Sequence, residues 1–476
     1  MINIVTSLNF IQFFAAAGGG GSSSSGEGGG GILIVLFLAS YIPTYKMGKR
    51  YRKRYREDKD DESFKQAQIK TWSVTIAISA VAIIAGIFLG DLIAGILLGL
   101  LLILGAVLGA GSGLYAWFDA IKPNKKVQAQ LAQSATSDSI WNEEFLRQGS
   151  AKIYSLYQQD WSNFNLANMK TYMTPRYYNH VELMMSALWQ MNRRNVVTVR
   201  EIDSVEIVNI SDSVDNSLDM MTVGFSTTLE EALIDTKSNT VISQWLNTDE
   251  ANEYWRFQRD GNSWRLDGIN PLTESERTRE QQIQAFANSV NAYYTLDWGR
   301  LLLPTGSQLF DYGLQYQTGD INNHVIGKLA DSGRTYTDKL IYQIYTYSPL
   351  PANAGGPVYL IGQITVPKYY GNIVIRRRKG LFQSKIKGLV EVTLEWLDFN
   401  KKYQVFATSA EQVTSFELLN PQVMQWIEAV PFELNLEVVN NSIYFYAPWK
   451  NVSTMTDNDY RTMLGILQAA YRELKL

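Results

Sequence analysis

The residue types that most often carry catalysis are scarce in this sequence. Its 476 residues include no cysteine and two histidines, His180 and His324. No thiolate nucleophile, disulfide or cysteine zinc cluster can therefore form. The two histidines also lie far apart in sequence, which argues against a histidine-rich metal site or a Ser-His-Asp triad. Each histidine is more typical of a polar surface or capping position, and we expect no metal or other cofactor.

Carboxylates and loop amides give weak candidates for acid–base chemistry or cation binding. Glu230-Glu231 is a sequence pair whose side chains would point to opposite faces of a strand, so it is not a general acid–base pair. Residues 319–324, GDINNH, gather carboxylate, amide and imidazole groups but lack the spacing of a calcium loop. A tight turn held by Asp and Asn side chains is the more typical structure for such a stretch.

The stretch NEYWRFQRDGNSWRLDGI, residues 252–269, concentrates aromatic and charged residues around an Asp-Gly dipeptide. Asp260-Gly261 predicts a two-residue type I′ turn, because both positions accept the positive φ angles that this turn requires. In that register four apolar side chains share one face, predicted to be core or the wall of a pocket: Trp255, Phe257, Trp264 and Leu266.

The opposite face of the predicted hairpin raises an electrostatic question. The same register places Arg256 directly across from Arg265. A like-charge pair in this position is destabilising unless an acid or an anion lies between the two side chains. We therefore expect Asp267, Glu253 or an anion such as a lipid phosphate beside the pair.

Helices and strands with distinct periodicities precede this hairpin. Apolar spacings of three and four predict helices at 141–161 and 175–192, the second starting at a Thr-Pro pair. Strands are predicted at 196–210, 219–230 and 240–247. Helices followed by an antiparallel meander are typical of an α+β fold, in which the helices cover the concave face of a curled sheet.

The concave face of such a sheet would form a pocket lined by Trp, Phe, Leu and Met. Met184 and Leu188 of the second helix complete the predicted pocket wall. A lining with few titratable groups favours an acyl chain, an apolar helix or no guest at all.

The N-terminal part of the chain contains long apolar runs. Within 71–118 the one ionisable side chain is Asp91. Segments of about 72–89 and 92–118 are each long enough to cross a hydrocarbon core of roughly 30 Å as helices. An earlier run of about 32–45 is a marginal third span, because it is short and contains a proline.

Basic residues orient these predicted spans. A basic loop at 46–56 and the lysines after the last span belong on the inner side, which leaves everything after residue 122 in the cytoplasm. The loop also offers a candidate contact for anionic lipid headgroups: Arg50, Arg52, Lys53 and Arg54. The net charge of −3 argues against nucleic-acid binding. We expect a multi-pass protein of the cytoplasmic (inner) membrane.

Composition divides the chain into successive segments. Residues 1–31 join an apolar start, similar to a signal peptide that lacks its basic residues, to a flexible Gly/Ser-rich tract. The membrane region covers 32–121, and the polar, weakly patterned stretch 122–139 is predicted to be a tether. Two α+β domains are expected at 140–272 and 273–476.

The second of these domains is expected to be an antiparallel sheet with a closing helix at 457–474. It contains the densest basic patch after the membrane region: Arg376, Arg377, Arg378 and Lys379. This patch is either a solvated strand end or a headgroup contact aided by the neighbouring Leu381 and Phe382.

The 140–272 region resembles a known family through the motifs YQQDW, MTPRYY, VREIDSVEIVNI and the EYWxFxR and WxLDGI halves of the hairpin. These motifs are similar to the C-terminal domain of subunit 44 of the mitochondrial inner-membrane import translocase, a domain that bacterial membrane proteins share. The resemblance implies a nuclear-transport-factor-2-like cone with a large apolar pocket. For the mitochondrial member it also implies acidic-lipid contact and recruitment of a chaperone motor, but the recruiting part lies outside this domain. Residues 273–476 resemble a bacterial domain of unknown function, which brings no activity.

Because the cone fold also hosts isomerases with a buried Asp base, the candidate acids are Asp160, Asp203 and Asp267. Neither Asp160 nor Asp267 has a partner acid in an obvious position. We therefore predict a membrane-anchored, non-enzymatic binding or scaffold protein with an apolar pocket for a lipid or partner segment. Its expected partners are membrane lipids and other membrane or translocation proteins, in membrane organisation or protein translocation. The alternative is an enzyme acting on a lipid or other apolar substrate in the cone pocket.

Overall fold

The computed structural model divides the chain into two compact units, Met1–Lys122 and Pro123–Leu476. It describes residues 100–109, isolated positions before them, and most of 124–473. Within this last range the stretches outside the described part are 246–249, 271–277, 300, 303–319, 330–339, 349–357, 367, 379–385, 387, 409–417, 420, 431 and 450–453.

Most of the predicted membrane region lies outside the described residues. This holds for the N-terminal segment 1–31, for the basic loop 46–56, and for nearly all of the spans predicted at 32–45, 72–89 and 92–118. Residues 100–109 are helical. In the part of the chain that the structure describes, no helix is both long enough and apolar enough to cross a membrane.

The second unit begins with helix α5 (Lys125–Ser137), so the tether predicted at 122–139 is wrong. Asn124 caps the helix, its side chain accepting from the Lys126 N–H at 3.0 Å. Val127, Leu131 and Ser134 form its buried side. Three buried positions at helical spacing among ten polar or small ones give a weak pattern, which explains why the segment looks like a tether in the sequence.

Three further helices follow, and their ends are set by local polar groups. Helix α6 (Glu143–Asn163) starts at Asn142, whose side chain accepts from the Phe145 N–H, and ends at Phe164 in the left-handed region with φ 54°. Helix α8 (Pro175–Gln190) starts at the predicted Thr-Pro pair. The short helix α7 (Leu166–Tyr172) between them was not predicted.

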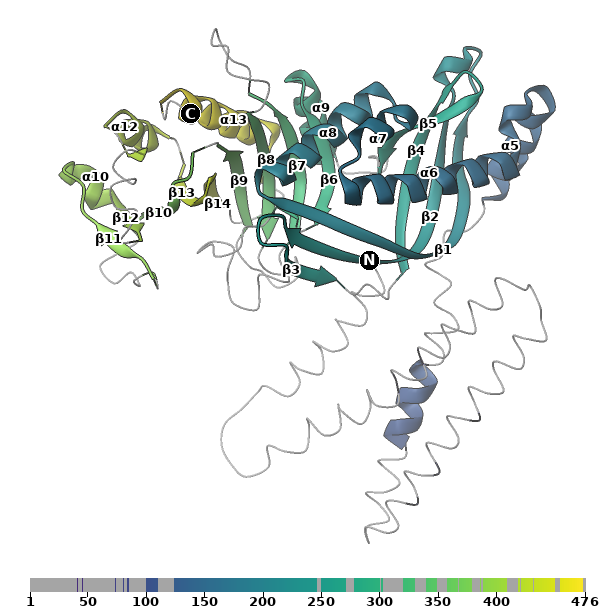
Figure 1. The fold of residues 1–476 in the computed structure, drawn as a ribbon, viewed down its shortest axis with the longest axis horizontal. Coiled ribbons are helices and arrows are strands. Elements are labelled where there is room, and N and C mark those ends of the chain that lie inside the picture. The colour runs from purple at the N-terminus through teal and green to yellow at the C-terminus, as the bar shows by residue number, and fades with distance from the viewer. Residues whose placement is uncertain are drawn as a thin grey trace. The chain divides into compact units, whose positions relative to one another are not determined.

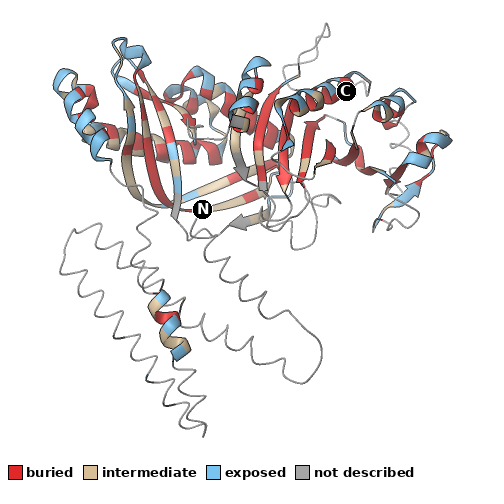
Figure 2. Cartoon of the chain, turned by 180° about the vertical axis from the view of Figure 1, so that it is seen from behind, coloured by how far each residue is buried: buried red, intermediate tan, exposed pale blue. Residues whose placement is uncertain are grey.

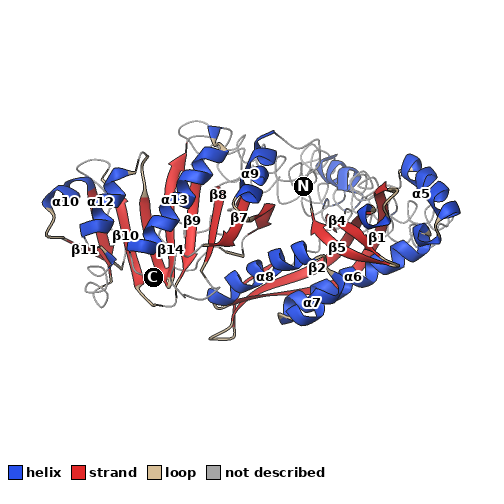
Figure 3. Ribbon diagram, turned by 90° about the horizontal axis from the view of Figure 1, so that it is seen from above, coloured by secondary structure: helices blue, strands red, loops and turns tan. Residues whose placement is uncertain are grey.

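An antiparallel five-stranded sheet follows these helices, with strand order β1-β2-β4-β5 and β3 also paired to β2. The strands are β1 (Arg193–Ser211), β2 (Met220–Asp235), β3 (Thr240–Trp245), β4 (Glu250–Asp260) and β5 (Ser263–Ile269). Three register shifts between β1 and β2 bend this long pair. Helices α6, α7 and α8 lie over one face of the sheet, so the predicted α+β fold is confirmed (Figures 1 and 3).

The register predicted for the β4–β5 hairpin is wrong by two residues, because the turn lies one residue further along the chain than predicted. Asp260 pairs with Ser263, so Gly261 and Asn262 form the turn, and Gly261 takes the positive φ of 60°. Phe257 therefore pairs with Leu266 instead of Trp264. A bulge next to Arg256 shifts the rest of the ladder, and Arg256 faces Gly268 instead of Arg265.

A second antiparallel sheet has nine strands in the order β11-β12-β10-β13-β14-β9-β8-β7-β6. The strands are β6 (Tyr293–Gly299), β7 (Asp320–Lys328), β8 (Ile341–Ser348), β9 (Val358–Thr365), β10 (Gly371–Arg377), β11 (Val390–Val392), β12 (Tyr403–Ala407), β13 (Asn435–Asn440) and β14 (Ser442–Trp449). Its helices are α9 (Thr278–Ser289), α10 (Leu397–Lys402), α12 (Pro421–Ala429) and α13 (Asp457–Glu473). Most residues of β8, β9, β10, β12, β13 and β14 and the inner sides of the helices are buried, whereas β11 is largely exposed (Figure 2).

The stretch 319–324, considered as a cation-binding loop or a tight turn, is neither. Residues 320–324 belong to β7, where Asn323 and His324 are buried, and Gly319 lies outside the described residues. The His324 Nε2 lies 2.9 Å from the Gln343 Oε1 on the neighbouring strand β8. The described residues contain no cluster of three or more His, Asp or Glu side chains suited to a metal ion.

The two sheets belong to one unit because their domains share a hydrophobic cluster. Leu188 of α8 and Ile361 of β9 both belong to it, together with Tyr345, Tyr347 and Tyr444 of the nine-stranded sheet. Polar contacts cross the same junction: the Gln363 Nε2 donates to the Met191 Sδ at 3.3 Å, and the Arg193 Nη1 to the Leu301 carbonyl at 2.8 Å. The helices α9, α12 and α13 pack on the opposite face, around a separate cluster.

We predict that Gly362→Ala loosens the contact between β9 and α13. A Cβ at Gly362 would lie 2.8 Å from the Met463 Sδ and 3.0 Å from the Leu467 Cδ2. Overpacking of this kind should lower the free energy of unfolding by about 1–3 kcal/mol, measured by urea denaturation. The control is Gly465→Ala in α13, where an added Cβ meets nothing within 4 Å and alanine favours the helix. Equal stability of the two variants would contradict the packing described.

Candidate functional site

The aromatic face of the hairpin is closed core. Trp255, Phe257 and Leu266 are fully buried, and Trp264 is nearly so. The Tyr154 ring centroid lies 4.7 Å from those of both Trp255 and Phe225, and Trp264 meets Trp141 edge-on at 5.0 Å. Aromatic side chains of the domain itself therefore cover the face that the sequence suggests for a ligand.

Met184 and Leu188 of α8 are buried in the same hydrophobic cluster. The structure thus brings together all six predicted pocket-wall residues, from α8, β4 and β5. Two cavities, at the α8–β1 junction and beside α12, are lined by other residues. A ligand-binding role for the six stays a prediction, since their observed contacts are those of a packed core.

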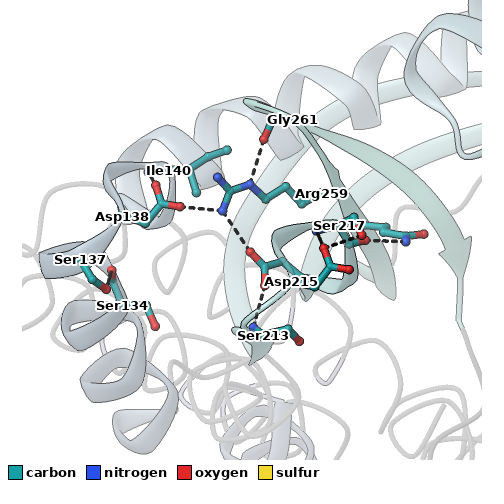
Figure 4. A network of polar contacts seen from close by, with 11 residues as sticks. Ser134, Ser137, Asp138, Ile140, Ser213, Asp215, Ser217, Arg259 and Gly261 are labelled. Carbon is teal, nitrogen blue, oxygen red and sulfur yellow. Dashed lines mark hydrogen bonds and ion pairs between the residues drawn. The ribbon is translucent and has the colours of Figure 1, made fainter.

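Arg259 is a buried charged residue that was not among the predicted site residues. It pairs with Trp264 across the hairpin and thus shares the core-facing side, with 7% of its side chain exposed. Its Nη1 donates to the Asp138 Oδ2 at 2.7 Å and to the Asp219 Oδ2 at 3.0 Å (Figure 4). Its Nε donates to the Gly261 carbonyl at 2.9 Å. This clamp ties the end of α5 to the edge of the five-stranded sheet.

The predicted acid next to Arg256 is present. The Arg256 Nε and the Asp267 Oδ2 are 2.7 Å apart, and the Thr174 hydroxyl donates to the Asp267 Oδ1 at 2.9 Å. Arg265 instead pairs with Asp260 at 2.5 Å. Asp267 neutralises Arg256 and Asp260 neutralises Arg265. No bound anion is therefore needed to balance the charge of these two arginines.

The candidate general bases are committed to structural hydrogen bonds. The Asp160 carboxylate accepts from the Asn165 Nδ2, the Asn168 Nδ2 and the Tyr172 hydroxyl, at 2.9, 2.7 and 2.9 Å. These contacts fix the α6–α7 turn. The Asp203 Oδ2 accepts from the Thr228 hydroxyl at 3.1 Å, and Asp267 joins α8 to the hairpin as described above.

Glu231 and Glu253 are titratable groups that were not predicted to lie near each other. Glu230 and Glu231 do point apart: Glu230 pairs with Arg200 at 2.7 Å, whereas burial and the nearby Glu253 raise the pKa of the Glu231 carboxyl to about 7. Burial also raises the pKa of Glu253, to which the Trp255 Nε1 donates at 3.0 Å. The inward position of Glu231 could have been predicted from the sequence, because Glu231 alternates with Leu229 and Leu233 along β2.

The basic patch at the end of β10 is held by protein contacts. Arg376 is half-buried, with its guanidinium 4.8 Å from the centre of the Phe406 ring. Arg378 donates to the Glu391 Oε1 at 2.8 Å and to the Asn400 carbonyl at 2.6 Å. Arg377 is exposed, and its backbone N–H donates to the Asn435 Oδ1. The other predicted headgroup contacts lie outside the described residues: Arg50, Arg52, Lys53, Arg54 and Lys379.

The structure brings the two histidines to the junction of the two domains. His180 of α8 stacks on Tyr293 of β6, with ring centroids 5.0 Å apart. Burial lowers the pKa of His180 to about 3, with the His324 charge adding to the shift. Burial likewise lowers the pKa of His324 to about 4. The sequence prediction of surface or capping histidines is wrong, because tertiary packing at the junction buries both rings.

The helices α6, α7 and α8 and the five-stranded sheet define an α+β class of domain, in which helices cover one face of an antiparallel sheet. Residues 127–271 match the sequence model of the Tim44-like domain family, so this part of the chain is a Tim44-like domain. The matched region starts within α5, the helix that the Arg259 clamp holds. No curated protein is significantly similar to the chain.

Solved structures show only distant likeness. The mycobacterial trehalose monomycolate transport factor A is 11% identical, with a TM-score of 0.28, over 41% of this chain and 96% of that chain. The intermembrane space region of the chloroplast protein ARC6 is 10% identical, with a TM-score of 0.21, over 27% of this chain and 97% of that chain. At such TM-scores neither likeness carries a functional argument.

We predict that Arg259→Met is strongly destabilising. It would leave the fully buried Asp219 without its cation, and breaking a buried pair in this way costs about 3–5 kcal/mol. The matched control is Arg265→Met, which removes a half-exposed ion pair worth about 1 kcal/mol or less. Urea denaturation of both variants checks the difference. Similar midpoints for the two would show that the clamp does not stabilise the domain.

Acid should destabilise the domain junction through the buried histidines. Unfolded histidine takes up a proton near pH 6.5, whereas the folded chain keeps both rings neutral until about pH 4 or below. Stability is therefore full above pH 6.5 and falls as the pH drops toward 4. His324→Gln should lose less stability than the unmodified chain between pH 7 and 5, in denaturation at each pH. An unchanged loss would contradict this assignment.

Proposed function

We propose that this chain is a membrane-anchored, non-enzymatic binding or scaffold protein of the bacterial cytoplasmic membrane. In this proposal the apolar N-terminal segments hold it in the bilayer. The Tim44-like domain and the domain that follows it then engage membrane lipids or other membrane proteins on the cytoplasmic side. Membrane organisation and protein translocation are the two settings that this proposal covers.

The non-enzymatic part of the proposal is supported by the hydrogen bonds of the candidate acids. Asp160 accepts three hydrogen bonds from Asn165, Asn168 and Tyr172, which hold the α6–α7 turn. Asp267 is shared between Thr174 and Arg256. A general base needs a lone pair directed at a substrate proton, and these carboxylates direct theirs at structural donors.

The joined domains support a scaffold role. A shared hydrophobic cluster fixes the Tim44-like domain against the nine-stranded sheet, so the pair presents one continuous surface to a partner. That surface includes large exposed apolar side chains, among them Trp189 at 64% and Leu218 at 58% exposure. Exposed aromatic residues are common anchors in protein and membrane contacts.

One observation favours the alternative, an enzyme acting on a lipid or other apolar substrate. The Glu231 carboxyl has a pKa of about 7 next to Glu253, on the helix-covered side of the Tim44-like sheet. A carboxyl that titrates near neutral pH is suited to general acid–base catalysis. This pair replaces the three aspartates as the acid–base candidate of the domain.

Photocrosslinking in cells tests the scaffold proposal. A photoreactive residue at Trp189 of the full chain should crosslink to lipids or membrane proteins, because that side chain is exposed next to Phe164 on the Tim44-like domain. The same residue at Lys401, which pairs with Asp398 on α10, is the control position. The protein should also stay in the membrane fraction after alkaline carbonate extraction. Release into the soluble fraction, or an absence of lipid and membrane-protein crosslinks from Trp189, would contradict the proposal.

The enzyme alternative has its own test. The full chain in detergent is assayed for turnover of bacterial lipid extracts, with Glu231→Gln and Glu230→Gln compared. We expect no turnover. Reproducible turnover that Glu231→Gln abolishes and Glu230→Gln preserves would establish the enzyme and overturn the non-enzymatic proposal.

A further inference from the structure

A cavity of about 330 Å³ lies where the Tim44-like domain meets the nine-stranded sheet. Arg193 at the start of β1 and the β2–β3 turn line one side, and the β13–β14 turn with Tyr444 lines the other. Its volume is within the range of small-molecule sites, which often form between domains. None of the predicted pocket-wall residues takes part, so this cavity is distinct from the interior of the Tim44-like domain.

Arg193 gives the cavity its main charge. The residue is 4% exposed, and its Nη1 donates to the Leu301 carbonyl at 2.8 Å. Within the described part of the chain, no carboxylate forms an ion pair with it. An arginine side chain stays charged at any physiological pH, and burying its charge without a counter-ion costs free energy. A buried arginine in a cavity wall therefore favours an anionic guest.

The acidic residue opposite Arg193 in the β1–β2 ladder does not neutralise its charge. Asp235 is its cross-strand partner in the β1–β2 ladder. The Asp235 Oδ1 instead accepts from the backbone N–H groups of Lys237 and Ser238, at 2.9 and 2.8 Å, and so holds the β2–β3 turn. Lys237 of this turn lines the cavity as a second cation. Two cations and one carboxylate leave an excess of one positive charge around the cavity.

The remaining lining limits the size and character of the guest. Tyr369, which is largely exposed, and the buried Tyr444 supply aromatic surface. Met191, Ile242 and Val439 add apolar surface. A compact anionic group carried on a small body fits this combination better than a long acyl chain, which needs a longer apolar channel.

We propose that this junction cavity binds a phosphate group, carried either by a small soluble molecule or by a lipid headgroup, with Arg193 and Lys237 as its counter-ions. An arginine fork engages two oxygens of a phosphate and leaves a third for the lysine, whereas a carboxylate has no third oxygen. Because the cavity joins both domains, a bound phosphate also stabilises their junction. The inference does not depend on the proposed scaffold role, since a soluble phosphate would occupy the cavity equally well.

Titration calorimetry on the full chain in a phosphate-free maltoside detergent tests this inference. The probes are inorganic phosphate, glycerol 3-phosphate and dihexanoyl phosphatidylglycerol. Lys237→Gln should weaken binding roughly tenfold, as expected for the loss of one charged hydrogen bond. Lys328→Gln, at an exposed lysine outside the cavity, is the matched control and should bind like the unmodified chain.

The pattern of binding identifies the source of the phosphate. Binding of inorganic phosphate or glycerol 3-phosphate supports a soluble ligand, and binding of the phospholipid alone supports a headgroup. Arg193→Gln should abolish binding. If the Arg193→Gln variant does not fold, binding by the Lys237→Gln variant tests the inference instead. Absence of binding by all three probes would overturn the inference. Equal affinities of the Lys237→Gln and Lys328→Gln variants would overturn it as well.

Discussion

The nine-stranded sheet must bury two apolar faces, and its own helices cover one of them. Helices α9, α12 and α13 pack against the cluster that includes Leu360 and Ile364. The opposite face, with Tyr345, Ile361 and Tyr444, packs against the Tim44-like domain. A sheet buried on both sides loses far more apolar surface to water than a one-sided sheet. This requirement explains why the two domains form one unit and why a cavity remains where their loops meet.

Two buried charged groups of the Tim44-like domain, Arg259 and Asp160, are paired in ways that fix its geometry. Arg259 joins α5 to the sheet through Asp138 and Asp219, and Asp160 closes the α6–α7 turn. Buried charges are tolerated when their partners are in place, and they then specify one arrangement of the surrounding elements. Arg193 differs from these groups, because among the described residues its side chain donates to a backbone carbonyl and forms no ion pair. This contrast is what distinguishes a structural charge from one available to a ligand.

Local signals predicted much of the fold, and tertiary effects account for the rest. The Thr174-Pro175 start of α8 and a two-residue turn between β4 and β5 follow from local chemistry and are present. The β4–β5 register depends on the turn at Gly261-Asn262 and on a bulge next to Arg256, neither of which a two-residue periodicity reveals. The burial of His180, His324 and Arg193 arises only when the two domains pack together. The burial of the hairpin face could therefore be predicted, whereas the junction cavity could not.

Hydrogen–deuterium exchange of the full chain tests the shared core most directly. Ile361→Ala and Leu360→Ala remove side chains from opposite faces of β9, the first toward the Tim44-like domain and the second toward α13. The two variants are compared under conditions in which their free energies of unfolding are equal. The amides of α8 should then exchange faster in Ile361→Ala than in Leu360→Ala, because only the first change opens the junction. Equal protection of α8 in the two variants would contradict a core shared by the two domains.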